Sequence, residues 1–260
     1  MNPRSPWATA TLVAVLVFLL GPFVVVFVAG FSADETLRFP PQSYSLHWLA
    51  QVFTVESFQR SFVTSLIVGF GSTSLALALG VPVAYALSRH APRGAEWVRT
   101  VLTLPLIVPG IIVGLALLDH GVLAFTLPVT LSLLVGHATL LVPYTVRVVG
   151  ASLANLRIDI DDAAVSLGAT PWQAFFLVVL PNIRAGVAAA FVLAFITSFN
   201  QVPVSLFLTG PGVNTLPIAM MAYMETSYDP SIAALSTLLV LFTIALVAAT
   251  EKMLGISKYV

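Results

Sequence analysis

Residues 159–181 read DIDDAAVSLGATPWQAFFLVVLP and form the longest stretch without membrane character in the second half of a very apolar chain. Asp159 is expected to cap a first short helix, because its carboxylate can accept a hydrogen bond from a free N–H group of the first turn, and Asp162 would complete a capping box. Gly168 is expected to end this helix, since the left-handed backbone conformation that often ends a helix costs glycine less free energy than any other residue. Thr170, followed by a proline and then a glutamine, predicts a second capped helix. The segment therefore predicts a rigid helix–turn–helix whose apolar ridge consists of Ile160, Ala163, Ala164 and Leu167.

The spacing of this segment resembles the EAA loop of permease subunits in binding-protein-dependent ABC importers, E-A-A-x3-G-x9-I-x-L-P. Asp162-Ala163-Ala164, Gly168 and Val178-x-Leu180-Pro181 follow that pattern without a gap, with Asp162 in place of the glutamate and Val178 in place of the isoleucine. In that family the loop is the coupling helix, which docks in a cleft of a separate ATPase subunit. The resemblance implies the same role for a coupling loop over residues 157–181, carried by Asp159, Asp161, Asp162, Ala163, Ala164, Leu167, Gly168, Pro171, Leu180 and Pro181. Without the motif, two capped helices between membrane spans would favour a passive interfacial loop.

The composition places most of the chain in lipid. Of its 260 residues, 58% are hydrophobic and only 8% are charged, whereas soluble domains carry roughly a quarter charged residues. The net charge of zero argues against nucleic acid as a partner. The chain has no cysteine, and its four histidines show no metal-binding spacing, so neither a disulfide nor a metal site is expected.

Long apolar runs predict an all-α integral membrane protein with six transmembrane helices and a single permease domain over residues 1–260. A span needs about 20 apolar residues, and six stretches qualify: 7–31, 58–87, 98–118, 126–149, 185–208 and 232–254. Unbroken runs favour helices over a barrel, whose strands would alternate over about 10 residues. The first run is too long for a typical signal peptide, so we interpret it as a retained span.

The distribution of lysine and arginine predicts the orientation. With a cytoplasmic N-terminus, only Arg38 and Arg60 lie outside, and nine basic residues lie inside: Arg4, Arg89, Arg93, Arg99, Arg147, Arg157, Arg184, Lys252 and Lys258. This is a strong positive-inside bias. Both termini and the coupling loop are therefore expected in the cytoplasm. The resemblance to importer permeases implies that the spans lie in the bacterial inner membrane.

Two spans carry features typical of a transport pathway. The third has Pro105, Pro109, Gly110 and Gly114, which predict a bent helix whose freed carbonyl groups need neighbours or water. The fifth has two adjacent amides followed by a proline, so the helix is expected to be interrupted there. We assign the substrate pathway to Ser198, Asn200, Gln201, Pro203 and Pro109. Hydrogen bonding between helices is the competing interpretation of the amides.

The chain lacks the motifs of an ATPase or a membrane hydrolase, so it is not expected to be an enzyme or to bind a cofactor. The resemblance is closest to the spermidine/putrescine-type branch of importer permeases, through residues 104–109 (LPLIVP), 208–212 (LTGPG) and 234–237 (ALST). It implies two ATP-binding subunits that use ATP and Mg, a second permease that is identical or different, a substrate-binding protein and membrane lipid as partners.

The predicted function is alternating-access import of a small organic solute. That branch often has two acids where this chain has Asn200-Gln201, so an amino acid derivative or another zwitterion competes with a polyamine as the substrate. Other classes stay open. A proton- or sodium-coupled carrier would need an ionisable relay inside the membrane, and a non-transporting assembly subunit would show no solute-dependent ATPase activity with its partners.

Overall fold

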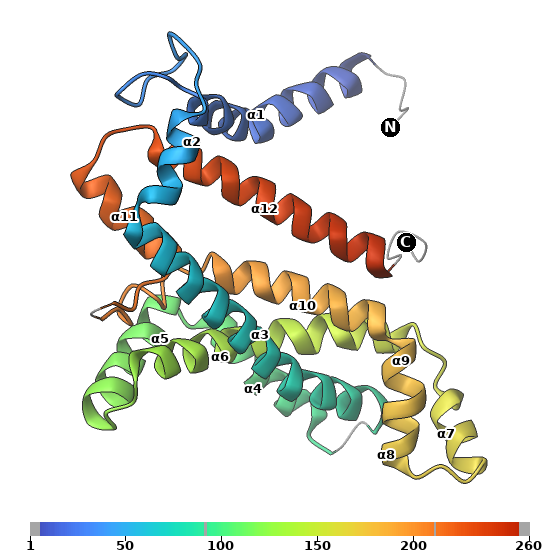
Figure 1. The fold of residues 1–260 in the computed structure, drawn as a ribbon. Helices are drawn as coiled ribbons and strands as arrows, with labels where there is room; N and C mark the ends of the chain where they lie inside the picture. Colours follow the sequence, from blue (N-terminus) through green and yellow to red (C-terminus); the bar gives the residue numbers. More distant parts are fainter. Residues whose placement is uncertain (1–5, 91–92, 211, 255–260) are drawn as a thin grey trace. The chain divides into compact units, whose positions relative to one another are not determined.

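A computed structural model describes residues 6–90, 93–210 and 212–254, and the regular elements of these residues are helices (Figure 1). Arg4, Pro211 and Lys258, which the orientation and resemblance arguments used, lie outside the described residues. The chain divides into two compact units, residues 1–59 with 219–244 and residues 60–218 with 245–260.

The first unit contains α1 (Pro6–Gly30), α2 (His47–Gln51), a 3-10 turn (Val52–Thr54) and most of α11 (Leu216–Thr226) and α12 (Ser231–Leu254). The connection after α1 folds back on the unit, since the Trp48 indole donates to the Asp34 carbonyl (3.0 Å) and the Leu37 N–H to the Tyr228 carbonyl (3.1 Å). Partial burial opposes ionisation of Asp229, but hydrogen bonds from Ser231 and Tyr223 outweigh it and hold the Asp229 pKa below its usual range.

The second unit contains the elements from α3 to α10. These are α3 (Glu56–Arg89), α4 (Ala95–Ile107), α5 (Gly110–Ala116) with a π-helical extension (Leu117–Ala124), α6 (Val129–Ala154), α7 (Asp159–Ser166), α8 (Pro171–Gln173), a π-helical stretch (Ala174–Val179), α9 (Leu180–Asn182) and α10 (Arg184–Phe199). α6 and α10 share the most extensive contact between elements of this unit, and α6 lies on α3 through Leu141 and Ala76. Thr145 of α6 donates to the Ala76 carbonyl (3.1 Å), so the small Ala76 side chain lies where α3 and α6 approach each other closely.

Four helices of the described residues are long and apolar enough to cross a membrane: α1, α3, α6 and α12. Two further pairs reach that length only together, α4 with α5 and its extension across a 90° bend, and Pro171–Asn182 with α10 across a 71° bend. The described residues therefore provide between four and six candidate spans.

The helix boundaries differ from the sequence prediction most clearly at the fifth span, predicted over 185–208. α10 ends at Phe199, and residues 200–208 form turns. The Asn200 side chain folds back onto the Ile196 carbonyl (3.0 Å), and Pro203 has no N–H to continue a helix. In the third predicted span, 98–118, the helix breaks between Ile107 and Gly110.

The two short helices of the 159–181 segment are present, but the predicted capping by Asp159 is wrong. Asp159 is the first residue of α7, Ile158 occupies the N-cap, and no side chain caps the helix. The Asp159 carboxylate instead accepts hydrogen bonds from Arg157 (2.6 and 3.1 Å). The capping box expected between Asp159 and Asp162 is therefore also absent. The signals of the turn and of the second helix are confirmed: Thr170 and Gln173 form a reciprocal capping box, and Gly168 has φ = +94°.

Candidate functional site

The hairpin, defined here as residues 159–182 (α7, the turn at Gly168, α8, the π-helical stretch and α9), projects from one end of the second unit (Figure 1). Its second arm is fixed by a buried face. Phe175, Val179 and Ile183 are 6%, 0% and 2% exposed and pack in one cluster with residues of α3, α6 and α10. The Phe175 ring lies 4.8 Å from the Tyr85 ring of α3. The second arm is thus continuous with the core of this unit.

The first arm is fixed by a buried ion pair. Arg89, at the end of α3, lies 3.4 Å from Asp161 of α7, and their side chains are only 6% and 14% exposed. Tyr85 donates to the same Asp161 oxygen (3.0 Å), and Arg89 also donates to the carbonyls of Leu156 and Arg157 (3.2 and 3.3 Å). Removing one partner of a buried charge pair strongly destabilises a protein, because the remaining buried charge has no partner. Asp161 therefore anchors the hairpin to α3.

The opposite side of the hairpin exposes large apolar side chains. Leu167, beside Gly168, is 90% exposed, and the other apolar side chains of this surface are Val165, Trp172, Phe176 and Leu177. Among the residues assigned to coupling, those exposed are Asp159, Asp162, Ala163, Leu167, Gly168, Pro171 and Pro181, whereas Ala164 and Leu180 are half-buried. Large exposed apolar side chains gathered on one short segment are typical of a contact surface.

Asp159 and Arg157 form a second ion pair, which lies on the surface. Hydrogen bonds and the nearby charge of Arg157 hold the pKa of Asp159 below its usual range, and Asp159 in turn raises the pKa of Arg157. Both side chains are well exposed, so this pair contributes little to stability. It therefore contrasts with the buried Arg89–Asp161 pair nearby.

The two interrupted helices of the second unit meet. We call this place the break region; it consists of residues 108–114, which cover the break after α4 and the first part of α5, and residues 200–205, after α10. A Cβ atom on Gly110 would lie 3.0 Å from Pro203 Cβ, and one on Gly114 would lie 2.7 Å from the Val204 carbonyl oxygen. Gly114 thus permits a close approach of the two backbones. Non-helical backbone at membrane depth is tolerated where it is buried in protein or lines a water-filled cavity.

A buried histidine–serine cluster, His137, Ser198, Ser205 and Ser72, closes the inner side of the break region. His137 on α6 is 1% exposed, its Nδ1 lies 2.9 Å from Ser198 Oγ and its Nε2 lies 3.0 Å from Ser205 Oγ. Ser198 also contacts Ser72 Oγ (2.9 Å), and Ser205 donates to the Gln201 carbonyl (2.7 Å). Ser72 in turn donates to the Val68 carbonyl (2.6 Å), and either tautomer of the His137 ring satisfies all but one of these contacts. The cluster joins α3, α6, α10 and the segment after α10.

The residues assigned to the substrate pathway have different surroundings. Ser198 is 3% exposed and belongs to the histidine–serine cluster. Asn200, Pro203 and Pro109 are exposed, and Gln201 is half-buried. Pro109 lies in the first half of the break region, Asn200, Gln201 and Pro203 lie in the second half, and Ser198 is linked to it through His137 and Ser205. The accessible polar groups are therefore the two adjacent amides.

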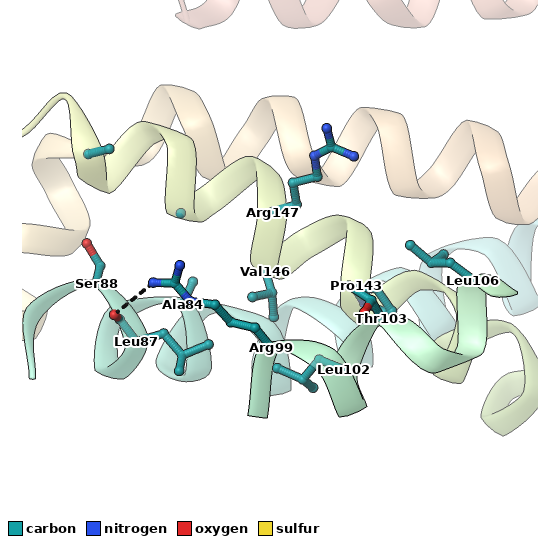
Figure 2. Close-up of a pocket in the computed structure, with 12 residues that line it drawn as sticks. Ala84, Leu87, Ser88, Arg99, Leu102, Thr103, Leu106, Pro143, Val146 and Arg147 are labelled. Atoms are coloured by element: carbon teal, nitrogen blue, oxygen red, sulfur yellow. Dashed lines mark hydrogen bonds between the residues drawn. The ribbon is translucent and has the colours of Figure 1, made fainter. Parts of the chain in front are cut away.

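A cavity of about 500 Å³ lies between α3, α4 and α6 (Figure 2). Among the described residues that line it, Arg99 and Arg147 are charged and Ser88 and Thr103 carry hydroxyl groups. The other described lining residues carry no polar side chain: Ala84, Leu87, Leu102, Leu106, Pro143, Val146, Gly150 and Ala154. Figure 2 shows Arg99 donating to the Leu87 carbonyl, at 3.5 Å. Within the described residues, no group of three His, Asp or Glu side chains could hold a metal ion.

Sequence reasoning missed the roles of Tyr85, Arg89 and His137. Arg89 contributed only to the orientation count, and His137 was one of four scattered histidines. A histidine within an apolar span was the available signal, because polar residues inside a membrane are costly unless paired. Its serine partners lie 61 and 68 positions away, so no local spacing could identify them.

Bent apolar helices around buried polar groups, with an exposed hairpin between two of them, define a helical membrane protein of the transporter class. Residues 76–253 match the family described as "Binding-protein-dependent transport system inner membrane component". The chain belongs to this family and is a permease subunit of an ABC importer. ATP hydrolysis in such systems resides in a separate subunit.

Relatives of known name resemble nearly the whole chain. The putrescine transport system permease protein PotI of Escherichia coli (strain K12) is 29% identical over 91% of this chain and 86% of its own length. The spermidine/putrescine transport system permease protein PotC of Escherichia coli (strain K12) is 28% identical over 92% and 90%. The putative 2-aminoethylphosphonate transport system permease protein PhnV of Salmonella typhimurium (strain LT2) is 28% identical over 96% of both chains.

Solved structures share the fold. A chain of a bacterial ABC transporter that imports the acidic polysaccharide alginate superposes with a TM-score of 0.70 and 18% identity, over 97% of this chain and 98% of its own. A chain of the MetNI methionine ABC transporter in an inward-facing conformation gives a TM-score of 0.62 and 18% identity, over 79% and 96%.

Proposed function

We propose that this chain couples ATP hydrolysis on partner subunits to alternating-access import through its hairpin. The observation that carries the proposal is the two-sided construction of the hairpin. One side is continuous with the core through Phe175, Val179 and the Arg89–Asp161 pair, and the other exposes Leu167 and Trp172. A partner that grips the exposed side would move the helices attached to the buried side.

The proposed assembly has two ATP-binding subunits, which bind ATP and Mg, a second permease that is identical or different, and a substrate-binding protein. The positive-inside distribution of arginine and lysine supports a cytoplasmic hairpin and cytoplasmic termini in the bacterial inner membrane. Closure of the ATPase dimer would draw the hairpins together and open the pathway outward, and hydrolysis would return it to the inward-facing state. The coupling free energy must pass through a contact that differs between the two states.

The proposed cargo is a small organic solute, namely a polyamine-like compound, an amino acid derivative or another zwitterion. Its route would pass the break region, where Asn200 and Gln201 are the accessible amides. The relatives named for putrescine, spermidine and 2-aminoethylphosphonate transport support a solute that carries an amino group.

The test is copurification of the ATPase subunit with Leu167→Asp, which places a charge on the exposed side of the hairpin. We expect the variant to insert normally, to lose the ATPase during purification and to lose ATP-driven uptake. The matched control is Leu37→Asp, an exposed leucine of the connection after α1, 61% exposed, for which copurification should not change. Retention of the ATPase by Leu167→Asp would refute the coupling role. A chain that never copurifies with a nucleotide-binding protein would favour an ion-coupled carrier or an assembly subunit.

A further inference from the structure

A cavity of the first unit is used by neither the hairpin nor the break region. It has a volume of about 660 Å³ and lies between the end of α1, the start of α12 and the segments 36–39 and 224–229. Residues of the two spans, such as Val25 and Ile232, form an apolar wall, and Arg38 and Asp229 add one charge of each sign. The lining is therefore amphipathic.

A second cavity, of about 460 Å³, adjoins the first within the same unit. Val26 of α1 and Ser236 of α12 line both cavities. The second cavity reaches Phe23, seven residues before the end of α1, and Val240, nine residues after the start of α12. At 1.5 Å of rise per residue, these positions lie about 10 to 14 Å inside the spans. No charged side chain is among the described residues that line this deeper part.

The two helices that enclose the cavities touch closely at one point. A Cβ atom on Gly30 would lie 2.5 Å from Thr237 Oγ1 and 3.0 Å from the Ala233 carbonyl oxygen. Ala29 and Gly30 are the buried residues of α1, so this contact involves only the last turn of a 25-residue helix. Apolar space between two spans favours hydrocarbon over water, because water there would lose its hydrogen bonds.

Arg38 and Asp229 supply the two charges that match a zwitterionic headgroup. Arg38 is exposed, and within the described part of the chain it makes no ion pair. The Asp229 oxygens each accept one hydrogen bond, from the Tyr223 hydroxyl (2.7 Å) and the Ser231 N–H (2.9 Å), and a carboxylate oxygen can accept a second. A guanidinium fits the oxygens of a phosphate, and a carboxylate accepts hydrogen bonds from an ammonium group.

These charges also lie at the depth that a headgroup requires. Arg38 follows the end of α1 by eight residues, and Asp229 precedes the start of α12 by two. Both therefore lie just beyond the ends of the spans, whereas the deeper cavity lies between them. A diacyl phospholipid matches the charged and the apolar part together. An apolar helix of another subunit would match only the deeper part.

We propose that the two adjoining cavities bind one phosphatidylethanolamine molecule of the surrounding membrane. Its phosphate lies at Arg38, its primary amine faces Asp229, and its acyl chains pass Val26 and Ser236 between α1 and α12. The lipid fills the space beside the contact at Gly30 and so holds α1 against α12. The proposed orientation of the chain puts this site in the outer leaflet. The site does not depend on the coupling role of the hairpin.

The test is native mass spectrometry of the delipidated importer complex during titration with three phospholipids of identical acyl chains. Phosphatidylethanolamine carries both the phosphate and an ammonium with N–H groups, phosphatidylcholine has no N–H on its ammonium, and phosphatidylglycerol has no amine. We expect one saturable site that prefers phosphatidylethanolamine. Arg38→Gln should raise its half-saturating concentration about 10-fold, as expected for the loss of a charged hydrogen bond. Asp229→Asn should reduce the preference over phosphatidylcholine.

Matched controls separate the site from general lipid binding. Arg60→Gln removes an exposed arginine expected on the same side of the membrane that does not line the cavity, and it should bind lipid like the wild type. Val26→Trp fills the place where the cavities adjoin and should abolish binding. Val17→Trp, at a residue of α1 that is 66% exposed and lines neither cavity, should not. Thermal unfolding of each variant confirms that it folds.

Three outcomes would overturn the proposal. Equal binding of the three phospholipids would mean that Asp229 does not recognise the amine. Wild-type binding by Arg38→Gln would remove the phosphate site. Absence of a saturable site, with cross-links from position 23 or 240 to the second permease, would assign the space to a helix of that subunit. Since none of these residues belongs to the hairpin, each outcome leaves the coupling test intact.

Discussion

The hairpin and the break region are both interruptions of regular helix in the second unit, but opposite interactions hold them. The hairpin rests on an apolar cluster and one buried ion pair, and turns apolar side chains outward. The break region is closed by hydrogen bonds of uncharged groups, with His137 at the centre, and leaves two amides accessible. The difference separates a segment that presents an exposed apolar surface from one that holds non-helical backbone among apolar helices.

The largest expected difference between the two regions comes from removing the buried ion pair of the hairpin. We expect Arg89→Leu to destabilise docking of α7 by about 3 kcal/mol or more, because Asp161 remains buried without its partner. Hydrogen exchange of residues 159–166 measures this, and solute-stimulated ATPase activity of the complex should fall with it. Arg157→Leu is the matched control on the exposed pair and should change neither. Unchanged protection in Arg89→Leu would mean that the apolar cluster alone docks the hairpin.

The corresponding change in the break region is His137→Leu, with a smaller expected effect of about 1–3 kcal/mol. Leucine removes both hydrogen bonds of the ring. Ser205 retains its hydrogen bond to the Gln201 carbonyl and Ser198 retains its hydrogen bond with Ser72, so part of the cluster stays paired. The unfolding midpoint of the complex and the exchange of residues 200–208 report the change. Ser198→Ala, which leaves the His137–Ser205 contact, should cost less. Equal losses in the two variants would show that His137 is not the centre of the cluster.

The same contrast explains what the sequence could predict. The turn at Gly168 and the capping box of Thr170 and Gln173 depend on neighbours within a few positions, and the sequence predicted both correctly. The predicted cap at Asp159 failed because Arg157, only two positions away, competes for the carboxylate. The Arg89–Asp161 pair and the His137 cluster join residues 61 to 126 positions apart, so only the fold brings them together. Polar residues in apolar spans therefore indicated a site without indicating their partners.

A substitution at the turn of the hairpin tests whether its two arms must be held rigidly. Gly168 has φ = +94°, and a Cβ atom there would meet no atom within 4 Å, so Gly168→Val is strained only through its backbone, by about 1–2 kcal/mol. We expect the protein to insert into the membrane and to bind its partner permease. ATP-driven uptake should fall, because the relative orientation of the two arms of the hairpin changes. Uptake in vesicles at equal expression measures the effect. Gly168→Asn is the control, since asparagine tolerates this conformation and should retain most of the uptake. Full uptake by the valine variant would argue against a rigid hairpin.

The smallest expected effect on stability comes from the accessible amides of the break region. Asn200→Leu combined with Gln201→Leu should change the unfolding free energy by less than about 1 kcal/mol, because Asn200 is exposed and its bond to the Ile196 carbonyl is local. Uptake should nevertheless fall strongly if these amides contact the passing solute. Thr197→Val is the matched control, since Thr197 bonds only the Leu193 carbonyl in α10 and should leave uptake unchanged. Loss of copurification with the second permease, at normal stability of the chain itself, would instead place the two amides at an interface between subunits. The break region would then contribute to assembly of the complex rather than line the transport pathway.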